Sequence, residues 1–167
     1  YNFSMKFRFL RKEDLSSILQ LFDCVLRTTK TWGWTEGYLS SNTISKEVQS
    51  NNFVGLFDKN KLVAVSYIGD RYNPDPVKIW KEDLKNPARW AKICVHPDYQ
   101  HKGVGKIFTT HILNLLKSLN YDGVRIIVAK NNIAAIKLYN KFNFVCVGDY
   151  QEFDIDWWCY ELKFEGV

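Results

Sequence analysis

The stretch Val95-His96-Pro97-Asp98-Tyr99-Gln100-His101-Lys102-Gly103-Val104-Gly105 decides the fold, because it joins a predicted buried strand to a predicted amphipathic helix. The apolar run Arg89–Val95 before it lies between Pro87 and Pro97, as a short buried strand does. Residues 106–119 after it carry apolar side chains at helical spacing: Ile107, Phe108, Ile112, Leu115, Leu116 and Leu119. A polar turn that opens a helix presents unpaired backbone N–H groups and the positive end of the helix dipole. The pattern therefore predicts an anion site, most naturally for phosphate.

This turn can be compared with three phosphate-binding sequence patterns: the P-loop, the dinucleotide fingerprint and Gln-x-x-Gly-x-Gly. A P-loop needs four residues between its glycines, whereas one residue separates Gly103 from Gly105. A dinucleotide fingerprint needs a third glycine where Phe108 stands. The pattern that remains is Gln-x-x-Gly-x-Gly over Gln100–Gly105. The alternative is an ordinary strand–turn–helix connection whose glycines only ease the turn.

A second stretch, Asn132 to Phe144, reads Asn-Ile-Ala-Ala-Ile-Lys-Leu-Tyr-Asn-Lys-Phe-Asn-Phe and follows the apolar strand predicted at Val124–Ala129. From the residues alone, Asn132 is a helix N-cap and Tyr139 is a core residue of an amphipathic helix. Asn143 suits the left-handed residue that ends such a helix, because asparagine tolerates positive φ best after glycine. We expect a further strand at Val145–Tyr150.

The remaining elements follow from hydrophobic spacing and turn residues. We expect strands at Met5–Leu10, Phe53–Phe57, Leu62–Ile68 and Trp157–Phe164, and a hairpin turn over residues 58–61. A helix that starts at Glu13-Asp14 should bury Leu15, Ile18, Leu19, Phe22 and Leu26, and a short helix should cover Ser45–Ser50. The polar insertion Asp70–Arg89 should hold one helical turn near Trp80–Leu84.

Together the two stretches resemble the signatures of the GNAT acyltransferase superfamily, over residues 90 to 150 and in the family's order. The second signature normally has glycine where Asn143 stands. The resemblance implies a single-domain α+β fold: a twisted, mixed, mostly antiparallel sheet of about six or seven strands, flanked by helices, with splayed central strands. It also implies acetyl-CoA as co-substrate, with direct transfer of its acetyl group to a primary amine of a small molecule or peptide.

The resemblance also assigns roles to residues. Backbone groups of Ile93, Cys94 and Val95 would pair with the pantetheine arm, and one N–H there would stabilise the oxyanion. The pyrophosphate would lie on Gln100, His101, Lys102, Gly103, Val104, Gly105 and Lys106. Asn132 would hold the pantetheine arm or the backbone beside it. Tyr139 would act as general acid and protonate the leaving thiolate.

The general base is not assigned by this pattern, because Arg89–Val95 contains no acid. An amine acceptor with a pKa of about 10.4 must lose a proton before it attacks. The candidates for the general base are Asp70, Asp149, Glu152 and a water chain. Without an assigned base, a non-catalytic acyl-CoA-binding sensor or interaction module remains the alternative function.

Two tryptophans are candidates for acceptor binding. Trp32 and Trp34 flank a glycine in a predicted loop, and aromatic rings there could stack on a cationic substrate. Plain packing is the alternative for each of them. The aromatic-rich segment 153–164 could form the edge of a homodimer or simply close the sheet.

Composition limits the other classes of protein. The chain has 167 residues, of which 46% are hydrophobic, enough for a sizeable core. Four cysteines without metal-ligand spacing favour a reduced cytoplasmic protein that binds no metal. A net charge of +5, spread along the chain, suits the phosphates of coenzyme A better than nucleic acid, and no apolar run predicts a membrane span. Met5 is the sole methionine, so we interpret 1–4 as a remnant and 5–167 as the acetyltransferase domain.

Overall fold

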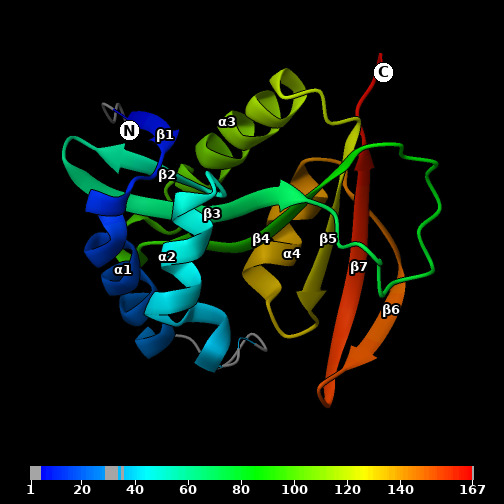
Figure 1. Ribbon diagram of the computed structural model, residues 1–167, viewed down its shortest axis with the longest axis horizontal. Helices are drawn as coiled ribbons and strands as arrows, with labels where there is room; N and C mark the ends of the chain where they lie inside the picture. The colour runs from blue at the N-terminus through cyan, green and yellow to red at the C-terminus, as the bar shows by residue number, and fades with distance from the viewer. Residues whose placement is uncertain (1–4, 29–33, 35, 167) are drawn as a thin grey trace. The chain divides into compact units, whose positions relative to one another are not determined.

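The computed structural model describes residues 5–28, 34 and 36–166, in which helices alternate with strands (Figure 1). The strands are β1 (Met5–Phe9), β2 (Phe53–Asp58), β3 (Lys61–Asp70), β4 (Pro87–Val95), β5 (Gly123–Ala129), β6 (Val145–Glu152) and β7 (Ile155–Lys163). The α-helices are α1 (Leu15–Thr28), α2 (Ser41–Gln49), α3 (Val104–Ser118) and α4 (Ile133–Lys141), with 3-10 turns η1 (Lys12–Asp14), η2 (Glu36–Leu39) and η3 (Pro97–Tyr99). Within the described residues the seven strands form one sheet in the order β1-β2-β3-β4-β5-β7-β6.

This sheet confirms the predicted α+β class with a mixed, mostly antiparallel sheet. The pairs β1/β2, β2/β3, β5/β7 and β6/β7 are antiparallel, and β4/β5 is parallel. The parallel register covers three residue pairs, from Pro87↔Gly123 to Arg89↔Arg125, at the start of both strands.

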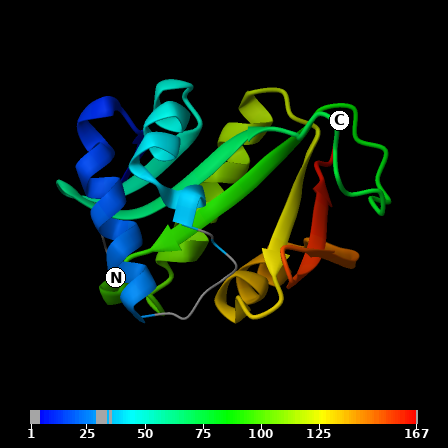
Figure 2. The same ribbon diagram turned by 60° about the horizontal axis from the view of Figure 1, so that its bottom comes forward.

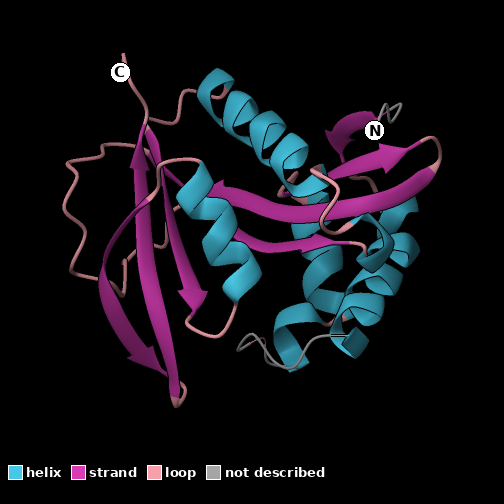
Figure 3. Ribbon diagram, turned by 180° about the vertical axis from the view of Figure 1, so that it is seen from behind, coloured by secondary structure: helices cyan, strands magenta, loops and turns pink. Residues whose placement is uncertain are grey.

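The chain divides into two compact units, residues 1–68 with 92–112 and residues 69–91 with 113–167. In the first unit, α1 and α2 lie side by side (Figures 1 and 3). The predicted stripe of α1 is partly wrong. Its buried residues are Ile18, Leu21, Phe22 and Val25, whereas Leu26 is 39% exposed. The helix is rotated so that Leu21 and Val25 replace Leu19 and Leu26 on the inner face, a choice that apolar spacing alone left open.

Helix α2 also begins earlier than the sequence predicted. The Ser40 hydroxyl accepts a hydrogen bond from the Thr43 N–H, at 3.2 Å, and so caps a helix that starts at Ser41 rather than Ser45. Ile44 and Val48, four residues apart, are its buried residues. A polar helix with only two core residues gives a weak periodic signal, which is why its first turn was missed.

In the second unit, β5, β7 and β6 pair in that order (Figure 2). The last strand, β7, therefore has a partner on both sides and is not an edge. This corrects the prediction that the C-terminal strand could form a dimer edge, since β6 takes that position.

Gly123 starts β5 where a Cβ would collide with the carbonyl oxygen of Leu162 on β7.

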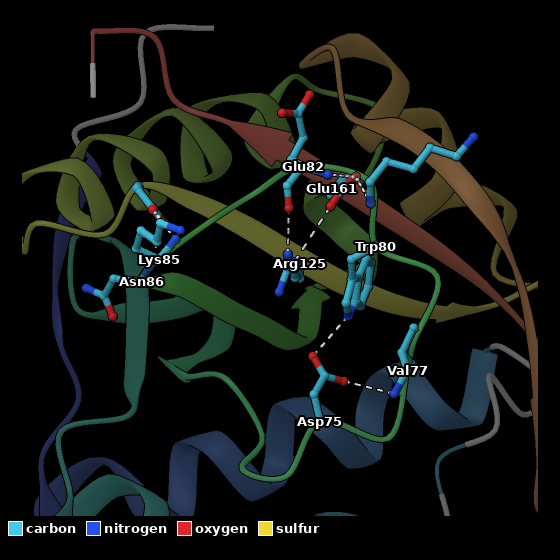
Figure 4. Close-up of polar contacts among 10 residues, drawn as sticks. Asp75, Val77, Trp80, Glu82, Lys85, Asn86, Arg125 and Glu161 are labelled. Carbon is cyan, nitrogen blue, oxygen red and sulfur yellow. Dashed lines mark hydrogen bonds and ion pairs between the residues drawn. The ribbon is translucent and has the colours of Figure 1, made fainter.

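Residues 71–86, here called the strap, join β3 to β4 and are held by carboxylates instead of forming a helix. Glu161 Oε1 accepts hydrogen bonds from the N–H groups of Lys81 and Glu82, at 2.8 and 2.9 Å (Figure 4). Asp75 accepts one from the Trp80 indole at 2.9 Å. The predicted turn of helix near Trp80–Leu84 is thus wrong, because the buried Glu161 carboxylate binds the N–H groups of Lys81 and Glu82 in a non-helical segment.

No helix in the described part of the chain combines the length and the apolar character that crossing a bilayer requires.

Candidate functional site

The predicted anion turn leaves β4 at Val95 and enters α3 at Val104, all within the first unit. The Gln100 side chain folds back, and its Nε2 donates to the Val95 carbonyl oxygen at 3.0 Å. The Ile107 N–H donates to the Gly103 carbonyl oxygen at 3.1 Å and closes the first helical turn. The helix therefore begins two residues earlier than predicted, and Gly105 lies inside its first turn.

Glycine is required at Gly103 by its backbone conformation. Its φ is +80°, in the left-handed region, and His101, two residues before it, has φ of +61°. A Cβ added to Gly103 would meet nothing within 4 Å, so the space beside the turn is open. Lys102 and Lys106 are exposed on either side.

These features fit a phosphate group. The N–H groups of Val104, Gly105 and Lys106 precede the first intrahelical donor, Ile107, so the helix itself offers them no acceptor. They lie at the positive end of a fifteen-residue helix, beside two exposed ammonium groups and an open face. An anion placed there gains charge-assisted hydrogen bonds without moving the chain.

The strand before the turn is mostly buried. Ile93 is 8% and Cys94 2% exposed, and Val95 is half-buried. Burial raises the pKa of the Cys94 thiol far above its usual value, so this thiol stays protonated near neutral pH. Cys94 is therefore a core residue, as its position in an apolar strand indicated.

The second signature lies in the other unit. Asn132 caps α4, with its Oδ1 accepting the Ala135 N–H at 3.3 Å, which confirms the N-cap prediction. Tyr139 is 3% exposed, and its ring centre lies 5.3 Å from that of Trp90 and 5.8 Å from that of Tyr160. Asn143 has φ of +65°, which confirms it as the left-handed residue after the helix.

The carboxylates considered as bases are engaged or exposed. Asp70 accepts a hydrogen bond from the Tyr121 hydroxyl at 2.6 Å. The hydrogen bond from Lys130 lowers the pKa of the exposed Asp149 carboxyl, which makes it a weaker base. Glu152 is exposed, and its hydrogen bond with Tyr150 raises the pKa of that phenol to about 12.

Of the two predicted acceptor-binding tryptophans, Trp32 lies outside the described residues. Trp34 is half-buried, with its ring centre 6.0 Å from that of Phe22 and 6.3 Å from that of Tyr38. These contacts are the packing that was the alternative for Trp34, and its role in acceptor binding stays a prediction.

The structure adds a group that sequence reasoning missed. Lys92 Nζ lies 2.6 Å from Glu47 Oε1, in an ion pair between β4 and α2 within the first unit. Lys92 is 5% exposed and has φ of +57°, in the middle of a strand. The sequence signal for this ion pair is a lone lysine in the apolar run Trp90–Val95. No residue near Lys92 in the chain indicates which carboxylate pairs with it.

Comparison with known proteins agrees with this geometry. The family model described as "Acetyltransferase (GNAT) family" matches residues 18–144, more than half of the chain. The chain therefore belongs to the GNAT acetyltransferase family, as the two signatures predicted. No curated protein was found to match it as a relative.

Solved structures show the same fold at low sequence identity. PaiA N-acetyltransferase from Thermoplasma acidophilum, in complex with coenzyme A, is 19% identical with a TM-score of 0.72, covering 96% of this chain and 99% of its own. The Salmonella typhimurium protein yncA, with its cofactor acetyl-CoA, is 14% identical with a TM-score of 0.74, covering 98% and 96%. The ribosomal-protein-S18-alanine N-acetyltransferase from Escherichia coli is 20% identical with a TM-score of 0.69, covering 98% of both chains.

Proposed function

We propose that this protein is an N-acetyltransferase that moves the acetyl group of acetyl-CoA directly to a primary amine of a small molecule or peptide. The observation that carries the proposal is the turn Gln100–Lys106, with its left-handed Gly103, its open face and the N–H groups at the start of α3. Coenzyme A carries phosphates that such a turn binds. The neighbours crystallised with coenzyme A or acetyl-CoA support the choice of cofactor.

In this proposal the first unit binds the cofactor mainly through its backbone. N–H groups of His101, Gly103, Val104 and Gly105 hold the pyrophosphate, with charge from Lys102 and Lys106, whereas the Gln100 N–H already donates to the Pro97 carbonyl oxygen at 3.3 Å. Backbone groups of Ile93, Cys94 and Val95 pair with the pantetheine arm. One N–H of that strand stabilises the oxyanion that forms when the amine attacks.

The second unit supplies Asn132 and Tyr139. Asn132 holds the pantetheine arm or the backbone beside it at the start of α4. The amine lone pair attacks the thioester carbonyl carbon, the C–S bond breaks, and Tyr139 gives its phenolic proton to the departing thiolate. The proton lost by the amine passes to water, from which the Tyr139 phenolate recovers its own proton. Water takes this role because Asp70, Asp149 and Glu152 are each hydrogen-bonded to another side chain.

The cysteines support a reducing compartment such as the cytoplasm for this enzyme. Cys24, Cys94, Cys146 and Cys159 are all free thiols.

Calorimetric titration with acetyl-CoA tests the proposal, with Gly103→Ala as the variant. A methyl group at φ of +80° strains the turn and moves its N–H groups, so we expect the Kd for acetyl-CoA to rise about tenfold, or about 1.4 kcal/mol. Gly166→Ala is the matched control, because Gly166 also has positive φ (+77°) and open space but lies at the C-terminus. If both variants bound acetyl-CoA with equal affinity, the turn would have no role in cofactor binding.

Turnover is then measured with a set of amines: 1,4-diaminobutane, a peptide with a free N-terminal alanine, and L-alanine. Loss of the thioester's ultraviolet absorbance is the suitable readout, because thiol reagents would also react with the exposed Cys146. Turnover of any amine supports the enzyme. Binding of acetyl-CoA without turnover of a broader amine set would favour the acyl-CoA sensor.

A further inference from the structure

The Glu47–Lys92 pair lies in an aromatic setting within the first unit. The Lys92 ammonium lies 4.1 Å from the centre of the Tyr38 ring and 5.8 Å from that of Tyr67. We call Tyr38, Glu47, Tyr67 and Lys92 the ammonium cluster. A carboxylate oxygen and two aromatic rings around one ammonium are the groups that proteins use to bind organic cations.

Stability alone does not account for this cluster. The side chain of Lys92 is 3% exposed and that of Glu47 17%, so both charges have lost most of their water. A buried ion pair usually stabilises a fold no more than apolar residues of similar volume. Lys92 also has φ of +57°, a conformation that costs a non-glycine residue about 1 kcal/mol or more. Strain and buried charge held together in a strand are more typical of functional sites than of plain cores.

The two charges differ in their access to a ligand. Lys92 is the inner member, and its ammonium is already bound by Glu47 Oε1. Glu47 is the outer member, on the half-buried side of α2, and among the described residues its carboxylate contacts Lys92 through Oε1. Its second oxygen, Oε2, is therefore the group that a second ammonium would meet.

One further aromatic ring, that of Trp34, lies next to Tyr38 of the cluster. Tyr38 and Trp34 are both half-buried, and their ring centres lie 6.3 Å apart. Lys92 also directly precedes Ile93, the first residue assigned to the pantetheine strand under the proposed function. The cluster thus lies along the chain beside the segment where acyl transfer would take place.

We propose that the ammonium cluster binds a second ammonium group of the acceptor, one that does not react. Glu47 Oε2 accepts a hydrogen bond from the acceptor's ammonium, and the Tyr38 and Trp34 rings cover its charge. Lys92 is a positioning residue that holds the Glu47 carboxylate in place through the ion pair at 2.6 Å. The acceptor class that fits is a diamine without a neighbouring carboxylate, in which one nitrogen stays an ammonium and the other loses its proton and attacks, so 1,4-diaminobutane should be preferred to L-alanine. This inference rests on the proposed function for the reaction but not for the binding of the amine.

Glu47→Gln is the first test, with Glu13→Gln as the control because Glu13 is an exposed glutamate at a helix start. We expect the KM for 1,4-diaminobutane to rise tenfold or more in Glu47→Gln, with the Kd for acetyl-CoA changed less than twofold. Glu47→Asp should recover part of the loss. A KM equal to that of Glu13→Gln, or an equal loss of acetyl-CoA affinity, would overturn the proposal.

The double variant Glu47→Gln/Lys92→Met separates binding from folding. It removes both buried charges, so its Tm should lie closer to the wild type than that of Lys92→Met, which leaves a carboxylate without its cation. The KM for the amine should stay high in the double variant. Recovery of KM together with Tm would show that the pair only supports the fold.

Direct calorimetric titration of 1,4-diaminobutane distinguishes this inference from the proposed function. Binding to the wild type that weakens in Glu47→Gln supports the ammonium cluster even if acetyl-CoA does not bind. Equal binding to both proteins, or no binding to either, overturns the cluster while leaving the acetyl-CoA test to stand on its own result.

Discussion

The two family signatures of this protein are built in different ways. The Gln100–Lys106 turn is exposed and presents backbone N–H groups, with positive φ at His101 and Gly103. The Asn132–Phe144 segment contributes buried side chains to the core. One of them, Tyr139, packs against Trp90, Phe144 and Tyr160. The first region depends on backbone conformation and the second on core packing, so different substitutions should damage each of them.

Tyr139→Phe should have the largest effect on turnover. The phenyl ring keeps the contacts with Trp90 and Tyr160, but the proton donor is lost, so we expect kcat to fall about 10²- to 10⁴-fold with nearly unchanged acetyl-CoA affinity. Steady-state rates and calorimetry on the same sample measure both quantities. Wild-type rates across the pH range would remove Tyr139 from the acid role.

Tyr139→Ala sharpens the same point, because it removes the ring as well. Loss of a large buried aromatic side chain should lower the free energy of unfolding by about 3 to 5 kcal/mol, measured by urea denaturation. If Tyr139→Phe destabilised the fold as much as Tyr139→Ala, the hydroxyl would be a structural group and its assignment as an acid would fail.

Lys102→Ala and Lys106→Ala should have smaller effects. Both side chains are exposed and add charge beside the turn, so each variant should weaken acetyl-CoA binding only a few-fold. The loss should shrink as salt is added. Lys12→Ala, which removes an exposed lysine from η1, serves as the control. A loss larger than that of Gly103→Ala would mean that side chains, rather than backbone, dominate the anion site.

Asn143→Gly should have the smallest effect, and a favourable one. Asn143 has φ of +65°, which glycine adopts without strain, so we expect the free energy of unfolding to rise by up to about 1 kcal/mol. Thermal denaturation measures the change, and turnover should stay as in the wild type. A lower Tm would show that the asparagine side chain makes up for the strain at this position.

Much of the fold and part of the candidate site follow from residues close together in the chain. The turn, the N-cap at Asn132 and the left-handed Asn143 each depend on a few neighbours and on steric preferences of single residues. The hairpin between β2 and β3 was predicted for the same reason. The helical turn predicted at Trp80–Leu84 does not form, because Glu161, about eighty residues away in the sequence, accepts hydrogen bonds from the N–H groups of Lys81 and Glu82.

The sequence by itself determined that this protein has the GNAT fold, with a glycine-containing turn at the start of α3 and a capped α4 that contains Tyr139. These features are local, since a glycine, a cap residue or an apolar period acts within one or two turns of the chain. The tertiary structure alone decided that β7 is an inner strand and that Lys92 meets Glu47 beside Tyr38. Such pairings depend on segments brought together by burial of the core, and no residue near Lys92 in the chain specifies which carboxylate will receive its charge.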